Sequence, residues 1–400
     1  MKSEWKTIRA DEFCSLVTDG THDSPKPQAA GRKLITSKHL KGYYLDFESA
    51  NWISSEDYER VIARSSVEQW DILYSMIGTI GNVYLEKNPV VDYACKNVGI
   101  FKFGGNCNKA YWMYYYLKSP QAMEFIKAHL RGTTQLYVPL ATLREMPVPV
   151  PDEEEMNKIV AILRTLDDKI QCSIKINDNL EQQAVALFKS WFVDFSLFGG
   201  TVPENWEDTT LENITTLITR GIAPKYSDNS DQTVVNQKCI RNHTIDLSLA
   251  RTHTPKAINE KWLQFGDLLI NSTGDGTLGR VAQVWFTPKS LTVDSHVTIV
   301  RPAREELIFY IGLWGILHEK EIESLHTGST GQTELPRDRV KMLKLLLPDN
   351  ISLSRFNSII APMASTIILN QEENQKLASL RDTLLPKLMS GEIDVSSIQL

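Results

Sequence analysis

The stretch Ile159–Phe192, IVAILRTLDDKIQCSIKINDNLEQQAVALFKSWF, decides the fold, because its apolar residues return at alternating steps of four and three. Such heptad spacing is typical of a long helix that packs along a second helix. Two polar residues near the middle interrupt an otherwise apolar seam. The positions that we expect along this helical seam are Ile159, Leu163, Leu166, Ile170, Ser173, Asn177, Leu180, Ala184, Leu187 and Trp191.

A looser copy of the pattern lies 197 residues later, near the end of the sequence. If the two helices run antiparallel, Asn177 comes opposite Asn370, and Ser173 comes opposite Asn374. A buried amide layer of this kind fixes the register of paired helices, because a misaligned amide loses its partner. The expected positions of the second seam are Phe356, Ile360, Met363, Ile367, Asn370, Asn374, Leu377, Arg381, Leu384 and Leu388.

The simpler interpretation of the polar steps is that both face water. About forty residues at about 1.5 Å each would form a helix of roughly 60 Å. Pro362 lies inside the second pattern, and a proline inside a helix bends it or marks a new start.

Three further matches indicate that the rest of the chain is an internal repeat. WKTIRADEFCSLVTDG, which begins at Trp5, aligns with WEDTTLENITTLITRG, which begins at Trp206. The segment SMIGTIG resembles NSTGDGTLG, and RGTTQLYVPLATLREMPVPVP, from Arg131, resembles TGSTGQTELPRDRVKMLKLLLP, from Thr327. Because the matches keep the same order and nearly the same offset, the sequence predicts two similar units.

We therefore predict an α+β fold, in which two similar strand-rich, mixed α/β domains are separated by two long antiparallel helices that share a pseudo-two-fold repeat. Runs such as HVTIV and RVAQVWF indicate short strands, and SLFGGTVPENW marks a boundary between the halves. The expected strand-rich domains are residues 1–150 and 199–348. The expected helical segments are residues 151–198 and 349–400.

Composition limits the classes of function. The chain has 43 basic and 49 acidic residues, a net charge of −6, so a nucleic-acid role cannot rest on bulk charge. Its five cysteines are scattered without a CxxC pair, which favours a reducing cytoplasm over a disulfide or zinc framework. No apolar leader or membrane-length apolar run is present, so we expect a cytoplasmic protein that is not inserted into a membrane.

Motifs for catalysis are weak or missing. GDGTLG fits G-x-G-x-x-G, but a strand follows it where a dinucleotide site needs a helix, so we expect a tight turn between strands. No Walker-type phosphate loop and no NPPY or DPPY segment of an amino-methyltransferase occurs, and the histidines form no metal-binding motif. We expect no catalytic residue and no metal ligand in this chain.

Polar loops in both halves carry the side-chain types that contact base edges and phosphates in DNA. The competing interpretation is that they are solvated loops and turn formers. The candidates in the first half are Lys26, Gln28, Arg32, Lys33, Ser37, Lys38, His39, Lys41, Arg131 and Gln135. The candidates in the second half are Lys225, Lys238, Arg241, Asn242, His243 and Gln332.

With these features the chain resembles the specificity (S) subunit of type I restriction-modification systems. LDDKIQCSIKINDNLEQQAVALFKSWFVDF looks like the central conserved region of that family, and SLRDTLLPKLMSGEIDV is similar to its C-terminal conserved region. VPENW looks like the entry to its second target-recognition domain. The second copy departs from the pattern with Arg381 on the seam and Pro362 inside the helix.

The resemblance implies that each target-recognition domain binds one half of a split target in double-stranded DNA. The helices would set the gap between the halves and dock two methyltransferase (M) subunits, which bring S-adenosylmethionine. A restriction and motor (R) subunit would join to cleave unmodified DNA. This chain would bind no cofactor and catalyse nothing.

The aromatic residues Phe188, Trp191 and Phe192 would either hold partner helices or pack in a larger core. The runner-up function is a bivalent protein-binding scaffold with no DNA role. A stand-alone nucleotide-dependent enzyme is the third class.

Overall fold

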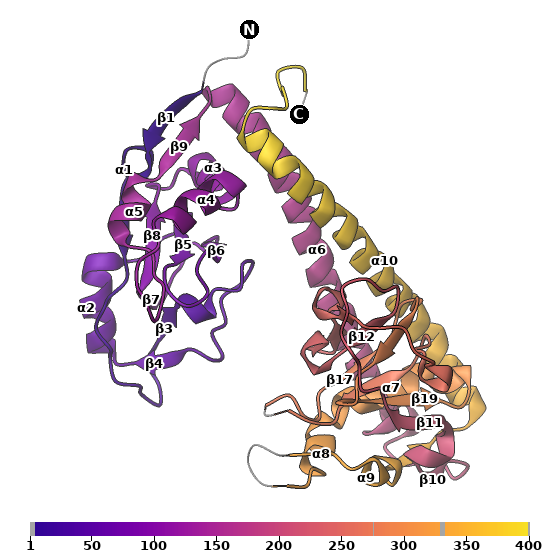
Figure 1. Ribbon diagram of the computed structural model, residues 1–400. Helices are drawn as coiled ribbons and strands as arrows, with labels where there is room; N and C mark the ends of the chain where they lie inside the picture. The colour runs from indigo at the N-terminus through magenta and orange to yellow at the C-terminus, as the bar shows by residue number, and fades with distance from the viewer. Residues whose placement is uncertain (1–4, 275, 329–332, 399–400) are drawn as a thin grey trace. The chain divides into compact units, whose positions relative to one another are not determined.

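The computed structural model describes residues 5–274, 276–328 and 333–398. It divides into two compact units: unit 1 is Met1–Gln171 with Asn374–Leu400, and unit 2 is Cys172–Glu373. The helices α6 (Glu153–Phe192) and α10 (Asn350–Met389) each have 40 residues and contribute to both units. Each unit therefore combines a strand-rich domain with one part of each long helix (Figure 1).

Unit 1 is built from three small sheets. The largest is antiparallel and has the order β2 (Leu16–Asp19), β8 (Val98–Lys102), β5 (Ile72–Ser75), β6 (Val83–Leu85). In the second sheet, the central β3 (Arg32–Thr36) runs antiparallel to β4 (Asn51–Ile53) and parallel to β7 (Tyr93–Lys96). The third pairs β1 (Lys6–Arg9) with β9 (Pro147–Val150). The helices are α1 (Ala10–Phe13), α2 (Ser55–Ser65), α3 (Cys107–Leu117), α4 (Pro120–Ala128) and α5 (Leu140–Glu145).

Unit 2 repeats the topology of these three sheets and adds one short two-stranded pair. Its largest sheet has the order β11 (Thr215–Arg220), β19 (Val297–Pro302), β16 (Leu268–Asn271), β17 (Val281–Gln283). The central β12 (Thr233–Val235) again has one antiparallel neighbour, β15 (Arg251–Thr252), and one parallel neighbour, β18 (Leu291–Val293). The remaining pairs are β10 (Glu207–Thr210) with β20 (Lys344–Leu347), and β13 (Ile240–Arg241) with β14 (Thr244–Ile245). The expected fold class and internal repeat are confirmed.

The shorter helices complete the fold. Unit 2 also contains α7 (Ile308–Leu317), α8 (Glu319–Ser324) and α9 (Arg337–Lys341). The 3-10 helices are η1 (Ser37–His39), η2 (Ser196–Phe198), η3 (Leu211–Ile214), η4 (Gln237–Cys239), η5 (Leu247–Leu249), η6 (Asn259–Lys261) and η7 (Glu305–Leu307). Among the described residues, no helix is both long enough and apolar enough to cross a membrane.

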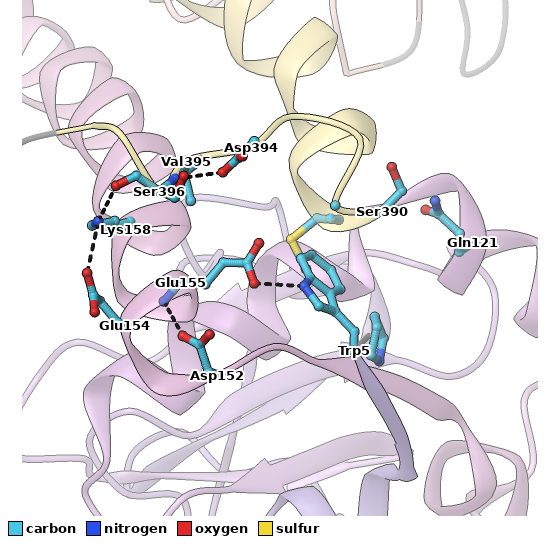
Figure 2. Close-up of a pocket in the computed structure, with 13 residues that line it drawn as sticks. Trp5, Gln121, Asp152, Glu154, Glu155, Lys158, Ser390, Asp394, Val395 and Ser396 are labelled. Carbon is cyan, nitrogen blue, oxygen red and sulfur yellow. Dashed lines mark hydrogen bonds and ion pairs between the residues drawn. The ribbon is translucent and has the colours of Figure 1, made fainter. Parts of the chain in front are cut away.

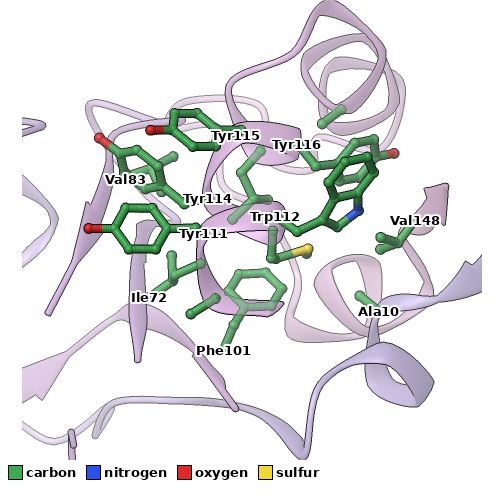
Figure 3. Close-up of a cluster of buried hydrophobic side chains, with 14 of the residues drawn as sticks. Ala10, Ile72, Val83, Phe101, Tyr111, Trp112, Tyr114, Tyr115, Tyr116 and Val148 are labelled. Carbon is green, nitrogen blue, oxygen red and sulfur yellow. The ribbon is translucent and has the colours of Figure 1, made fainter. Parts of the chain in front are cut away.

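The core of the domain in unit 1 forms around α3, whose sequence CNKAYWMYYYL is buried from Ala110 onward. Asn106 caps the helix, because its side chain accepts a hydrogen bond from the Lys109 amide at 3.0 Å. Figure 3 shows the aromatic rings of α3 packed above strand residues such as Ile72 and Phe101. The polar end of Trp112 is satisfied, since its Nε1 donates to the Pro149 carbonyl at 2.9 Å.

Both long helices enter the core of each unit. In unit 1, Ile159 and Leu163 of α6 share one buried cluster with Leu385 and Leu388 of α10. In unit 2, Ala184 and Phe188 of α6 share a cluster with Phe356 and Ile360 of α10. In unit 1 the start of α6 contacts the end of α10, and in unit 2 the end of α6 contacts the start of α10. The helices therefore pair antiparallel within each unit.

Of the two roles expected for Phe188, Trp191 and Phe192, the structure supports core packing. All three rings are buried and lie between 4.8 and 6.0 Å from the ring of Phe356, measured between centroids. They are therefore not available to hold partner helices.

The polar step of the seam pairs in unit 2. Asn370 Nδ2 donates to Asn177 Oδ1 at 2.8 Å, and Asn177 Nδ2 lies 3.5 Å from the Ile367 carbonyl. The helix α10 begins at Asn350, so Pro362 lies inside it and is not its start. The remaining seam positions that are half-buried rather than buried are Leu166, Leu180, Leu187, Met363, Asn374, Leu377, Arg381 and Leu384.

Each long helix begins beside a tryptophan that donates to a carboxylate. Trp5 Nε1 donates to Glu155 at 2.9 Å, and Trp206 Nε1 donates to Asp349 at 2.8 Å. Burial opposes ionisation of Asp349, but hydrogen bonds from Ser352, Trp206 and Ile351 together outweigh it and lower the pKa of Asp349 to about 2. The repeat therefore extends to the contacts that position the helix ends.

Candidate nucleic-acid interface

Three loops meet at one end of the β2-β8-β5-β6 sheet in unit 1, at residues 37–41, 76–82 and 131–137. Thr79 Oγ1 donates to the Ser37 carbonyl at 3.3 Å, and Asn82 Nδ2 donates to the Leu40 carbonyl at 2.8 Å. The Val138 amide donates to the Met76 carbonyl at 2.8 Å. We call this set the loop cluster of unit 1.

The same three loops meet in unit 2. Asn271 Nδ2 donates to the Gln237 carbonyl at 3.1 Å, and Thr273 Oγ1 lies 3.2 Å from Gln237 Oε1. The Leu335 amide donates to the Ser272 carbonyl at 2.8 Å. Among the described residues, this loop cluster of unit 2 consists of residues 237–243, 272–274, 276–279, 327–328 and 333–335. Gln332 belongs to it in sequence but lies outside the described residues.

The glycine-rich segments are turns within these loop clusters. β16 and β17 pair antiparallel on either side of GDGTLG, as β5 and β6 do around MIGTIG, so the interpretation as a tight turn between strands is confirmed. Gly132 has a more specific role, because it has a φ of +101° and a Cβ there would lie 2.2 Å from the Gln135 carbonyl oxygen.

Most of the candidate DNA-contacting residues are exposed. Those exposed in unit 1 are Lys26, Gln28, Arg32, Lys38, Lys41, Arg131 and Gln135. Those exposed in unit 2 are Lys225, Lys238, Arg241 and Asn242. The loop cluster of unit 1 brings together Lys38, Lys41, Arg131 and Gln135. Gln28 and Arg32 instead lie beside β4, where their backbones pair with Trp52 and Ile53.

Ser37, His39 and Lys33 differ from the other candidates, because each makes a hydrogen bond inside the chain. Ser37 and His39 are buried, and Ser37 Oγ donates to the Asn97 carbonyl at 3.0 Å. His39 Nδ1 accepts from the Thr36 amide at 2.9 Å, and burial lowers the pKa of His39. Lys33 Nζ donates to the Ala50 carbonyl at 2.8 Å. These residues shape the loop that presents Lys38.

His243 is also engaged within unit 2. Its Nδ1 lies 2.7 Å from Glu181 of α6, and its Nε2 lies 3.1 Å from Glu319 of α8. The hydrogen bonds to Glu181 and then to Glu319 raise the pKa of His243 to about 9. The protonated ring donates to both carboxylates, so it fastens the loop to the long helix and leaves no nitrogen for a ligand.

This contact predicts a pH-dependent stability of unit 2. The folded pKa of His243 lies above the ordinary value near 6.5, so its stabilisation is complete below about pH 6.5 and disappears as the pH rises through about 9. At pH 6 we expect the free energy of unfolding of wild type to be roughly 1–2 kcal/mol larger than that of His243→Gln, a range that allows for screening of the contact by solvent. Urea unfolding from pH 6 to 10 measures the gap, and a gap that stays constant up to pH 10 contradicts this prediction.

The matching loop of unit 1 uses Tyr43 in place of His243. Tyr43 donates to Asp167 of α6 at 3.2 Å and accepts from Arg381 of α10. Asp167 also binds Arg381 at 2.8 Å and the hydroxyl of Tyr115 at 3.1 Å. Sequence analysis did not identify this network, although the position of Arg381 on an apolar seam was a signal of it.

A separate pocket of about 780 Å³ lies in unit 1 at the start of α6 (Figure 2). Figure 2 shows Trp5 directed at Glu155, and Lys158 between Glu154 and the carbonyl of Ser396. The carboxylates that line it are Asp152, Glu154, Glu155 and Asp394. Its negative charge makes it unsuitable for a nucleic acid backbone.

Comparison with known proteins connects this geometry to a family. Residues 2–182 match the family model described as "Type I restriction modification DNA specificity domain". The chain is 28% identical over 399 residues to the type I restriction enzyme MjaIX specificity subunit of Methanocaldococcus jannaschii, covering 91% of this chain and 87% of that protein. It is 22% identical over 412 residues to the HindI specificity subunit of Haemophilus influenzae, covering 83% and 88%.

The fold is also found in a solved structure. The type I restriction-modification system S subunit from M. genitalium superposes with a TM-score of 0.56 at 15% identity, covering 96% of each chain. At this identity the likeness concerns the fold.

Proposed function

We infer the function of this chain from the premise that it belongs to the specificity subunits of type I restriction-modification systems. It is the subunit that recognises the DNA sequence, and each unit carries one target-recognition domain for one half of a split target. The observation that carries this conclusion is the repeated loop cluster, which places exposed polar side chains at the same edge of the same sheet in both units. Such side chains are suited to read base edges and hold phosphates.

The long helices are the proposed docking surface for two methyltransferase subunits. Ile174, Ile176 and Leu369 in unit 2 and Leu380 in unit 1 are exposed apolar residues on α6 and α10. Exposed apolar residues on a helix suit packing against helices of a partner. In this proposal the partners supply S-adenosylmethionine and the catalytic residues, a restriction subunit joins them, and this chain works in the cytoplasm without catalysing a reaction itself.

Methylation mapping tests the proposed function directly. Adenine methylation is mapped in the host with this gene present and with it deleted, in each case with the methyltransferase gene intact. We expect one split motif to lose methylation on deletion. If no methylated motif depends on this gene while the protein still binds its protein partners, the result favours a bivalent scaffold instead.

Exchange of one domain tests whether the two units recognise DNA independently. Residues 1–150 are replaced by the corresponding domain of another specificity subunit, and the methylated motif is mapped again. We expect one half-site to change and the other to stay. A change in both half-sites contradicts independent recognition.

Lengthening both helices tests their role as a spacer. One heptad inserted into α6 and one at the matching level of α10 keep the apolar seam in phase, because seven residues complete nearly two turns. The insertion adds about 10 Å, so we expect the gap in the methylated motif to grow by roughly 3 base pairs with both half-sites unchanged. The readout is methylation mapping, and altered half-site sequences would count against the spacer.

A further inference from the structure

Unit 2 contains a small basic pocket that none of the candidate residues from the sequence includes. The pocket has a volume of about 280 Å³ and is lined by Thr219, Arg220, Gly221, Lys261, Glu334 and Arg337. These residues come from the end of β11, from η6, and from the segment that leads into α9. Glu334 pairs with Thr273 and Thr327 through isolated β-bridges, so the pocket borders the loop cluster of unit 2.

The pocket presents hydrogen-bond donors that the protein leaves unused. Arg220 binds Glu334 at 2.5 Å and the Leu335 carbonyl at 2.8 Å through its two terminal nitrogens. Its Nε is buried and has no acceptor among the described residues. A buried donor without an acceptor indicates an additional ligand or an ordered water.

The other two cations also have free donors. Lys261 Nζ donates to the Gly221 carbonyl at 3.1 Å, which leaves two of the three ammonium hydrogens. Arg337 is exposed, and its guanidinium contacts no acceptor in the part of the chain that the structure describes. Three cationic side chains therefore face one carboxylate, that of Glu334, and the excess of positive charge suits an anion.

Within the described ranges, unit 1 does not repeat the basic charge of this pocket at the matching strand end. The repeat aligns Arg220 with Asp19, which reverses the charge at the end of the strand. Asp19 is buried and is neutralised locally, because Arg64 binds it at 2.6 Å and His22 lies 3.0 Å away. An anion site at this point of the fold is therefore specific to unit 2.

We propose that this pocket binds one backbone phosphate of the DNA next to the second half-site, through Lys261 and Arg337, with the guanidinium of Arg220 adding positive charge beside them. The proposal rests on the proposed function and deepens it. Guanidinium and ammonium groups bind phosphate oxygens by charge-assisted hydrogen bonds, and such a contact fixes the register of the protein on the duplex without reading sequence. The contact therefore strengthens binding of the second domain to DNA of any sequence.

The test uses this chain in complex with its methyltransferase subunits and compares two charge-matched double variants. Lys261→Gln/Arg337→Gln removes two pocket cations, and Lys289→Gln/Lys344→Gln removes two exposed lysines of the same unit. Affinity for duplex DNA that carries the mapped motif is measured as a function of salt concentration. We expect the pocket variant to lose roughly ten-fold in affinity and about one unit of the salt slope, with the methylated motif unchanged. A pocket variant that matches the control in affinity and slope overturns the proposal.

Two further arms separate the possible causes of an effect. Arg337→Gln alone alters only an exposed side chain, so a smaller change of the same kind supports the contact without disturbing the fold. Inorganic phosphate is added as a competitor at matched ionic strength, and we expect it to weaken DNA binding by wild type but not by the double variant. If the double variant loses phosphate binding but keeps wild-type DNA affinity and slope, the pocket serves free phosphate and the proposal is overturned. A wild-type complex that prefers no DNA sequence refutes the proposed function instead.

Discussion

Arg381→Ala is expected to lower the free energy of unfolding of unit 1 by about 3–5 kcal/mol, the range for a buried ion pair that loses one partner. Arg381 and Asp167 are both largely buried and lie 2.8 Å apart. Without the guanidinium, the hydroxyls of Tyr43 and Tyr115 are the hydrogen-bond donors that the described residues leave to the Asp167 carboxylate. Urea unfolding, followed by hydrogen exchange of strands β5 and β8, measures the loss in unit 1.

The internal repeat supplies a matched control for this prediction. At the offset of 197 residues, Asp167 corresponds to Ala364 and Arg381 to Ala184, and both alanines are buried in unit 2. The double variant Asp167→Ala/Arg381→Ala therefore gives unit 1 the pair that unit 2 uses. We expect the double variant to be more stable than Arg381→Ala alone, because no unpaired charge remains. Losses that simply add would contradict the ion-pair explanation.

The same variant has an expected effect on recognition. Tyr43 lies between Asp167 and Arg381, and the loop that carries Tyr43 also carries Lys38 and Lys41. Loss of Arg381 removes one of the two contacts that hold this loop on the helices. We expect the variant to bind the first half-site more weakly, and methylation of the target to fall as a result. Recognition of the second half-site should be the same as in wild type.

Phe356→Ala is expected to destabilise unit 2 by about 3–5 kcal/mol, as large aromatic truncations in a packed core do. The side chain of Phe356 is fully buried on α10. Its ring lies 6.0, 5.6 and 4.8 Å from those of Phe188, Trp191 and Phe192, all on α6. Its truncation therefore removes the aromatic part of the contact between the two helices in unit 2. Hydrogen exchange of β16 and β19 reports the loss for unit 2.

Ile359 provides the control on the same helix. It is one turn away and exposed, so Ile359→Ala is expected to change the stability by less than about 0.5 kcal/mol. Phe356→Leu keeps most of the buried volume and should lie between the two. Equal losses for Phe356→Ala and Ile359→Ala would mean that the aromatic cluster does not hold the helices together.

The amino-acid sequence by itself determined the two long helices and the repeat. Both follow from patterns that are local or periodic. A heptad pattern of apolar residues dictates which face of a helix is buried, and segments of similar sequence adopt similar folds. The pairing of Asn177 with Asn370 follows the antiparallel register that these patterns predict. The glycine turns were also predictable, because positive φ is a property of the residue itself.

Only the tertiary structure decided which polar residues are free. Ser37 and His243 are residue types that suit a DNA-contacting loop, but their partners Asn97, Glu181 and Glu319 are distant in sequence. The Asp167–Arg381 pair joins positions 214 residues apart, and the basic pocket gathers residues from β11, η6 and the start of α9. A side chain's availability depends on what the folded chain places beside it, and neither spacing nor composition records that proximity.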